Sequence, residues 1–148
     1  MTLINMLVGL PMMMLCLLVQ TATAFWSVRH YVSRTDHLDA RGGFFASTRP
    51  LLSAMIIMMV GNFAQILLWG VLFVLLNEFD DYHVAIYHSA VNFASLGYGD
   101  IVMSKGWKML GALEAVVGVL MLGMTSAALM AILSQLIKVQ RRALGHEE

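Results

Sequence analysis

Three long apolar segments dominate the chain, at residues 2–28, 50–77 and 109–137. The first two contain no charged residue, and the third contains only Glu114. Each exceeds the about 20 apolar residues that an α-helix needs to cross the hydrocarbon core of a membrane. Residues 83–94 form a shorter helical pattern, which is expected to enter the membrane only halfway. The pattern predicts an all-α membrane protein with three transmembrane helices and one re-entrant segment.

Prolines and glycines refine these predicted helices. The first helix is expected over residues 3–31, with a kink at Pro11. Pro50 is expected to begin the second helix, because the missing N–H of proline does no harm in a first turn. Three glycines interrupt the third predicted helix, residues 107–139: Gly111, Gly118 and Gly123. Small residues allow close packing and also lower the cost of bending, and the sequence does not choose between these roles.

Several amide and hydroxyl side chains fall inside the apolar segments. Gln20, Thr21 and Thr23 lie in the first, whereas Asn62 and Gln65 lie three residues apart on one face of the second. Polar amides at this depth are expected to face protein, because lipid offers them no hydrogen-bonding partner. They are therefore predicted to join the helices by hydrogen bonds rather than to line an ion path.

The charged residues predict how the chain is oriented. Basic residues lie between the first and second segments and after the third: Arg29, Arg34, Arg41, Arg49, Lys138, Arg141 and Arg142. Acidic residues precede the short helix: Glu78, Asp80 and Asp81. The positive-inside rule then places the N-terminus outside and the C-terminus in the cytoplasm, in a multi-pass protein of the plasma membrane. The first segment is longer than the apolar core of a signal peptide, so it is expected to be a retained helix.

The composition excludes several classes of function. A chain with 59% hydrophobic residues is not an ordinary soluble domain. It shows no pattern of a catalytic triad, a phosphate-binding loop or a cluster of metal ligands. We therefore expect neither an enzyme nor an organic cofactor, and no nucleic-acid partner. Membrane lipid is the expected surrounding.

The most informative stretch is the hexamer Ser95-Leu96-Gly97-Tyr98-Gly99-Asp100, between the short helix and the third segment. Irregular backbone at membrane depth is tolerated only where protein buries it or where it lines a watery path. Gly97 and Gly99 can adopt positive φ, which other residues adopt only at a cost. A glycine-rich hexamer at this place indicates a pore or a binding site.

The hexamer resembles the selectivity filter of the tetrameric potassium-channel superfamily, in which backbone carbonyls replace the hydration shell of the ion. The resemblance implies a homotetramer around one pore, with K+ as the transported ion. It further implies that Gly99 lies at the outer mouth and that four residues ligate K+ through their carbonyls: Ser95, Leu96, Gly97 and Tyr98. Threonine and valine are usual in the family where Ser95 and Leu96 stand here.

The same resemblance divides the chain into regions. Residues 50–140 correspond to a pore domain, with an outer helix at 50–77, a pore helix at 83–94, the filter at 95–100 and an inner helix at 107–139. Residues 1–49 are expected to be an N-terminal transmembrane helix with a cytoplasmic linker, and residues 141–148 a short cytoplasmic tail. Inner helices of such channels bend at a glycine to gate, which makes Gly118 and Gly123 hinge candidates.

Four residues are expected to support the filter: Tyr87, Val91, Asp100 and Glu114. Tyr87 stands where tryptophan is common, and its hydroxyl is predicted to donate to Asp100. Val91 stands where some members carry a glutamate. A carboxylate is costly inside a membrane, so Glu114 is predicted either to replace that glutamate behind the filter or to pair with Lys105 or Lys108.

Two other functions stay open at this point. Ala94 and Leu96 depart from the commonest filter residues, and a looser filter would give a weakly selective monovalent cation channel. The other alternative is a non-conducting membrane subunit that regulates another transporter.

Overall fold

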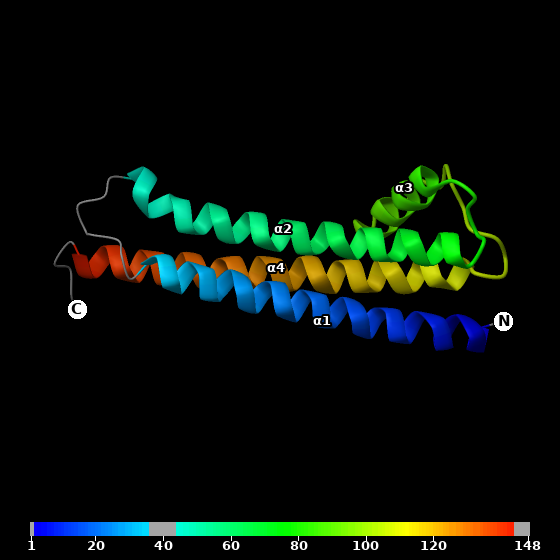
Figure 1. The fold of residues 1–148 in the computed structure, drawn as a ribbon, viewed down its shortest axis with the longest axis horizontal. Coiled ribbons are helices and arrows are strands. Elements are labelled where there is room, and N and C mark those ends of the chain that lie inside the picture. Colours follow the sequence, from blue (N-terminus) through cyan, green and yellow to red (C-terminus); the bar gives the residue numbers. More distant parts are fainter. Residues whose placement is uncertain (1, 36–43, 144–148) are drawn as a thin grey trace.

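The computed structural model describes residues 2–35 and 44–143, and every regular element within them is an α-helix. The four helices are α1 (Thr2–Thr35), α2 (Phe44–Leu75), α3 (Tyr82–Phe93) and α4 (Lys108–Ala143), shown in Figure 1. Three stretches are long and apolar enough to cross a membrane: Thr2–Ser33, Thr48–Leu75 and Lys108–Lys138. The prediction of an all-α chain with three spans and one shorter helix is confirmed.

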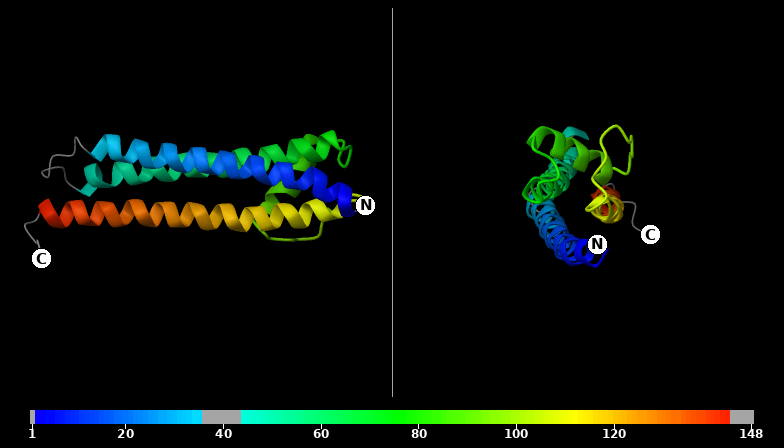
Figure 2. Two further views of the ribbon diagram at one scale, coloured as in Figure 1. Left: turned by 90° about the horizontal axis from the view of Figure 1, so that it is seen from below. Right: turned by 90° about the vertical axis from the view of Figure 1, so that its right-hand side faces the viewer.

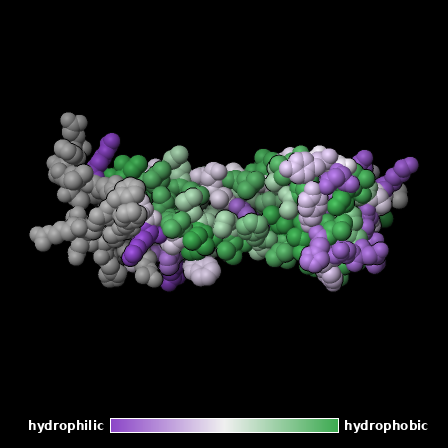
Figure 3. Space-filling model, turned by 90° about the horizontal axis from the view of Figure 1, so that it is seen from above, coloured by the Kyte–Doolittle hydropathy of each residue, from purple (hydrophilic) through white to green (hydrophobic). Residues whose placement is uncertain are grey.

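The three long helices run side by side, and α3 lies at one end of the bundle against α2 and α4 (Figure 1 and Figure 2). The beginning of α1 lies at the α3 end, whereas α4 ends at the opposite end (Figure 1). Hydrophilic surface gathers at the α3 end, and apolar surface covers the middle of the bundle (Figure 3). This distribution suits a membrane-spanning bundle, because charged groups are costly at the bilayer centre.

The start of α2 differs from the predicted one. The helix begins at Phe44, so Pro50 lies inside it rather than in its first turn. Proline has no N–H to donate to the carbonyl of Ala46, and its ring crowds that turn, which bends a helix. The first turns of α2 accordingly lie at an angle to the rest of the helix (Figure 1).

The end of α4 also lies beyond the predicted position. The helix continues to Ala143 instead of ending at residue 139, so the first residues of the predicted tail are helical. Between Gly123 and Gly145 the sequence contains neither glycine nor proline, and therefore no residue that usually stops a helix. Both bounds of α3 and the start of α4 differ from the predicted ones by a single residue.

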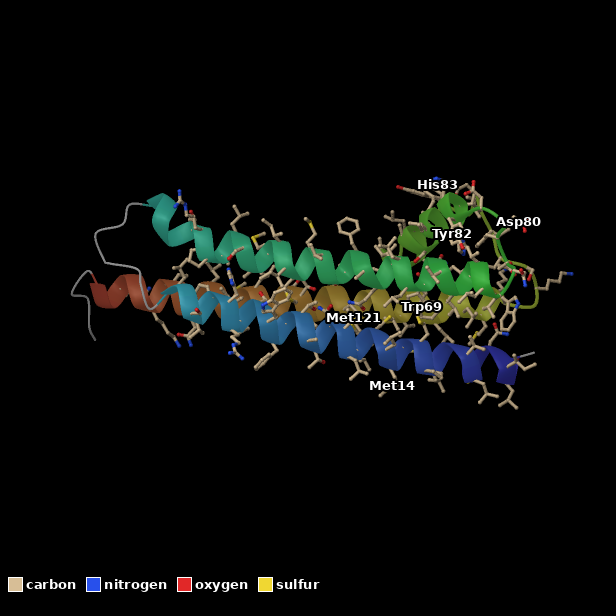
Figure 4. All side chains as sticks on the ribbon, in the orientation of Figure 1. Met14, Trp69, Asp80, Tyr82, His83 and Met121 are labelled. Atoms are coloured by element: carbon tan, nitrogen blue, oxygen red, sulfur yellow. The ribbon has the colours of Figure 1, made fainter. Side chains whose placement is uncertain are left out.

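The interior of the bundle contains two clusters of buried side chains. The larger cluster surrounds α3 and includes Trp69 and Phe73, whose ring centroids lie 5.8 Å apart. Trp69 and Met121 point between the helices, whereas Met14 lies on the outer side of α1 (Figure 4). The smaller cluster joins α1, α2 and the second half of α4 through four residues: Tyr31, Ala54, Ile132 and Leu136.

The inner face of α1 is built largely from small and polar residues. They are buried against α2 and α4: Asn5, Gly9, Cys16, Gln20 and Ser27. Small residues let helices in lipid approach closely, and polar residues can hydrogen-bond across the interface. The predicted interhelical role does not extend to Thr21 and Thr23, whose hydroxyls donate to carbonyls of α1 itself. α1 nevertheless packs against α2 and α4 as part of the bundle.

Polar side chains join the three long helices at one level, and we call them the amide network. Gln20 Nε2 of α1 donates to the carbonyl oxygen of Met121 (3.1 Å) and to Thr125 Oγ1 (2.9 Å) on α4. Gln65 Nε2 of α2 donates to Gln20 Oε1 (2.8 Å), and Asn62 Nδ2 donates to Thr125 Oγ1 (3.2 Å). The prediction that Gln20, Asn62 and Gln65 join the helices by hydrogen bonds is confirmed.

α4 passes the carboxyl end of α3 at very short range. A Cβ atom on Gly118 would lie 1.9 Å from the carbonyl oxygen of Phe93 and 2.6 Å from its carbonyl carbon. A side chain at this position would therefore force the two backbones apart. A Cβ on Gly123 would meet no atom within 4 Å. Close packing thus accounts for Gly118 within the chain, but not for Gly123.

Replacing Gly118 with alanine is expected to lower the melting temperature of the detergent-solubilised protein. The new methyl group overlaps the α3 backbone, and overpacking of this kind costs about 1–3 kcal/mol. Gly123→Ala is the matched control and is expected to leave the melting temperature unchanged or raised, since alanine stabilises a helix over glycine by about 0.5–1 kcal/mol. Equal melting temperatures for the two variants, followed by tryptophan fluorescence, would contradict the contact assigned to Gly118.

Candidate functional site

The carboxyl end of α3 turns sharply into the hexamer at residues 95–100. The Leu96 N–H donates to the carbonyl of Val91 (2.9 Å), and the Ser95 N–H donates to the carbonyl of Asn92 (2.8 Å). With Ser95 at φ +55°, these two bonds form a Schellman motif, which ends a helix with one left-handed residue. Glycine is the usual residue at that position, so the serine adopts this conformation at a cost.

The backbone of the hexamer alternates between two conformations. φ is positive at Ser95 (55°), Gly97 (59°) and Gly99 (73°), and it is not positive at Leu96 and Tyr98 between them. Gly97 and Gly99 therefore have the conformation that their glycine identity predicted. The positive φ of Ser95 was not predicted, because it arises from the way in which α3 ends.

The described part of the chain leaves the hexamer uncovered. Residues 94–100 are all exposed, including the apolar side chains of Leu96 (54%) and Tyr98 (66%). A Cβ on Gly97 or Gly99 would meet no atom within 4 Å. An irregular segment at membrane depth must be covered by protein or line a watery path, because lipid cannot satisfy its peptide groups.

Hydrogen bonds fix the last residue of the hexamer and the loop that follows it. The Tyr87 hydroxyl of α3 donates to Asp100 Oδ2 (2.7 Å). Ser104 donates its hydroxyl to Glu78 Oε2 (2.8 Å) and its N–H to the other oxygen of the same carboxylate. The structure thus contains the predicted bond between Tyr87 and Asp100, and its effect on a filter stays a prediction.

A second set of polar contacts runs behind the hexamer. His88 Nδ1 lies 3.1 Å from the carbonyl oxygen of Ile101, which can only accept, so Nδ1 carries the proton. His88 Nε2 then accepts from Asn92 Nδ2 (2.9 Å), and the same amide donates to Glu114 Oε2 (3.3 Å). The Ser89 hydroxyl lies 2.5 Å from Glu114 Oε1. A continuous set of hydrogen bonds therefore connects Glu114 to the backbone beyond the hexamer, through Asn92 and a neutral His88.

Glu114 occupies the first of the two places predicted for it. Its side chain is fully buried (0% exposed) between α3 and α4. Among the described residues its hydrogen-bonding partners are Ser89 and Asn92, so the alternative pairing with Lys105 or Lys108 is not what this structure contains. The carboxyl group thus contacts the short helix from behind, at the level of the hexamer.

A cavity of about 330 Å³ separates the hexamer from α3 and α4. Its lining includes Val91, Gly97 and Gly99. Val91 therefore lies behind the hexamer, but a valine offers no hydrogen bond to it. Polar side-chain contacts on this side come instead from His88, which bonds Ile101 just beyond the hexamer, and from Asn92, which bonds His88; the sequence predicted neither contact. Their spacing of four residues, which puts both on one face of α3, is the signal that could have found them.

The electrostatics of this site agree with its hydrogen bonds. The bond from Tyr87 lowers the pKa of Asp100 because it stabilises the carboxylate, and the same bond raises the pKa of Tyr87. Burial lowers the pKa of His88, against the opposing influence of the Ile101 carbonyl and of the carboxylates of Glu78 and Asp100. At neutral pH Asp100 is therefore ionised and His88 is neutral, which is the state that the observed hydrogen bonds require.

Comparison with known proteins identifies the family of this chain. A family model described as "Ion channel" matches residues 61–135, just over half of the chain. The chain belongs to this ion channel family. The matched part of the channel begins within α2 and includes α3, the hexamer and most of α4, whereas α1 lies outside it. No curated protein and no solved structure matches the channel.

The two hinge candidates of the channel differ in their freedom to move. Gly118 is buried against the carbonyl of Phe93, whereas Gly123 is exposed and unobstructed. Only Gly123 therefore lies where α4 can change direction without separating from α3.

Replacing Tyr87 with phenylalanine removes the hydroxyl and keeps the ring. The pKa of Asp100 is expected to rise toward its ordinary value, measured by carbon NMR of the carboxyl group in micelles. Because the folded-state pKa of Asp100 is depressed, the bond contributes stability above the ordinary aspartate pKa and loses it as the pH falls through the depressed value. Tyr82→Phe, at an exposed tyrosine of the same helix, is the control. An Asp100 pKa that moves in neither variant would refute the role of the bond.

The neutral state of His88 predicts an effect of pH on stability. Its folded-state pKa lies below the ordinary value of 6.5, so unfolding takes up a proton and the melting temperature is expected to fall as the pH drops below 6.5. Glutamine can donate to the Ile101 carbonyl and accept from Asn92 without titrating. His88→Gln is therefore expected to weaken the pH dependence between about pH 7.5 and 5.5.

His83, which is exposed on α3, supplies the control for this experiment. His83→Gln is expected to leave the pH dependence as it is in the wild-type channel. If the loss of melting temperature in acid persists in full in His88→Gln, another group carries it and the assignment is wrong.

Proposed function

We propose that this channel is selective for potassium, which passes in single file down its electrochemical gradient. The carbonyl oxygens of Ser95, Leu96, Gly97 and Tyr98 ligate the ion, with Gly99 at the outer mouth. The observation that carries this proposal is the positive φ at every second residue from Ser95 to Gly99. In an ordinary extended strand successive peptide groups face opposite sides, and reversing φ at alternate residues turns the carbonyls to one side. Such a row of oxygens can replace the hydration shell of a cation.

A single chain offers only one wall of such a path. The exposed side chains of Leu96 and Tyr98, and the open space beside Gly97 and Gly99, need further protein to cover them. Four chains around one axis would cover the hexamer and complete the coordination of the ion. We therefore propose a homotetramer, with membrane lipid against the large apolar residues exposed on α1 and α2.

The orientation that we propose follows from the charges at the two ends of the bundle. Asp80 lies with Tyr82 and His83 at the α3 end (Figure 4). Arg29 in the last turns of α1 and Lys138 and Arg141 in the last turns of α4 are basic. The positive-inside rule favours the basic end in the cytoplasm and the α3 end outside a plasma membrane.

A weakly selective monovalent cation channel is the second candidate. One observation favours it, namely the cavity of about 330 Å³ directly behind Gly97 and Gly99. If neighbouring chains of the tetramer leave this space unfilled, the filter can widen, because its backbone then lacks the close packing that makes protein interiors rigid. The apolar Leu96 and the small Ala94 add no hydrogen bond that would oppose such widening.

Purified channel in liposomes with opposed potassium and sodium gradients is expected to give a reversal potential that follows potassium. Gly97→Ala is expected to reduce the flux strongly, because an L-residue pays about 1–2 kcal/mol in the left-handed conformation that φ +59° requires, and the proposed tetramer would pay it in each of its four chains. Thr21→Val is the control and is expected to conduct, since the Thr21 hydroxyl bonds within α1, away from the hexamer.

The outcomes of this experiment separate the candidates. A reversal potential that follows sodium as closely as potassium would replace the first candidate with the second. Tetramers that assemble but carry no flux would contradict conduction and favour a non-conducting regulatory subunit.

A further inference from the structure

The amide network contacts α4 at a turn where a backbone carbonyl accepts side-chain hydrogen bonds in addition to its helical one. The carbonyl oxygen of Met121 accepts from Gln20 Nε2 (3.1 Å) and from Thr125 Oγ1 (2.9 Å), in addition to its place in the helix. A threonine that bonds back to the carbonyl four residues earlier often bends a helix. Gly123 lies between these two residues and lowers the helical stability of the same turn.

This turn also separates two differently held parts of α4. On one side, Gly118 abuts the carbonyl of Phe93, and Glu114 contacts α3, so this part is fixed to the hexamer. On the other side, Ile132 and Leu136 belong to the smaller buried cluster with α1 and α2. Between them Gly123 is exposed, and a Cβ there would meet nothing within 4 Å. α4 is nevertheless straight through this region (Figure 2).

We propose that Gln20 is a positioning residue for the inner helix: it holds the turn from Met121 to Thr125 straight, and α4 bends at Gly123 when these hydrogen bonds are released. α1 then sets the equilibrium between two shapes of α4 and so the opening of the pore. The inference rests on the proposed conduction for its effect on opening, although the shape of α4 can be measured without it.

One acceptor in the amide network is unpaired within the described part of the chain, which weakens the network. All hydrogen-bonding groups of the Gln20 amide have partners, yet the Gln65 Oε1 atom is buried without a partner among the described residues. A buried acceptor without a partner destabilises the state that contains it. Its cost opposes part of the gain from the other bonds, so the network holds the straight shape less firmly than a fully paired network would.

The shape of α4 can be followed by electron paramagnetic resonance between two spin labels on one chain. The labels replace Leu52 on α2 and Ile137 on α4, both exposed, in a Cys16→Ser background, and labelled chains are diluted with unlabelled ones. Gln20→Met keeps the length of the side chain but removes its hydrogen bonds. It is expected to add a second distance and to change the ratio of the two shapes by about fivefold or more, as the loss of one or more hydrogen bonds implies.

Thr125 provides an independent test from the other partner. Thr125→Val removes the hydroxyl that accepts from Gln20 and is expected to give the same second distance, whereas Thr125→Ser keeps the hydroxyl and is expected to resemble the wild-type protein. The double variant with Gln20→Met is expected to shift the ratio by less than the sum of the two single changes, since both remove the bond between Gln20 and Thr125. Thr21→Val is the control, because the Thr21 hydroxyl bonds only within α1.

The same variants are then compared in single-channel recordings. Gln20→Met and Thr125→Val are expected to change the open probability about fivefold or more, with unitary conductance and reversal potential unchanged, because the hexamer is untouched. An unaltered distance distribution in both variants, or an equal change in Thr21→Val, would overturn the inference. A changed distance in a protein that carries no current would support the role of Gln20 while refuting the proposed conduction.

Discussion

The contact between Gly118 of α4 and the carbonyl of Phe93 fixes the arrangement around the hexamer. Since no side chain separates the two backbones there, Glu114, one turn earlier, reaches Ser89 and Asn92 on α3. Two turns earlier the helices still lie close, and a Cβ on Gly111 would come within 3.0 Å of Asn92 Nδ2. The crossing therefore brings one carboxyl group, one amide and one hydroxyl together in an otherwise apolar interior, where each supplies the partner that lipid would not.

α1 is attached to the channel at more than one level. Near its beginning, Asn5 Nδ2 donates to the carbonyl of Gly106, in the loop that follows the hexamer (2.8 Å). Halfway along, Gln20 contacts α4, and further on the Ser27 hydroxyl donates to the carbonyl of Ala54 on α2 (3.2 Å). A helix that merely anchored the chain would need only apolar residues, because lipid contact makes no demand for hydrogen bonds. The polar residues of α1 therefore indicate that hydrogen bonds to its neighbours determine where the helix lies in the bundle.

The sequence was sufficient for those features that depend on local pattern. Apolar length predicted the spans, and glycine identity predicted the conformation of Gly97 and Gly99. The bond between Tyr87 and Asp100 was predicted from the resemblance to the potassium-channel superfamily, and the interhelical hydrogen bonds of Gln20 from the lack of partners for an amide in lipid. Features that depend on where two helices cross could not be predicted, because the sequence of one helix does not define how that helix is rotated relative to another. The partners of Glu114 and the difference between Gly118 and Gly123 belong to this class, as does the bond from His88 to the backbone of Ile101.

The Schellman motif at the end of α3 accommodates serine at position 95 better than threonine, the residue usual there in the potassium channels that the hexamer resembles. Ser95 has φ +55°, and a β-branched side chain is a genuine outlier at positive φ. Serine keeps the hydroxyl and lacks the second branch, so it is the residue that retains an oxygen while allowing the helix to end in this way. A chain with threonine at this place would have to leave its short helix by another route. The identity of the first residue of the hexamer and the way in which α3 ends are thus coupled.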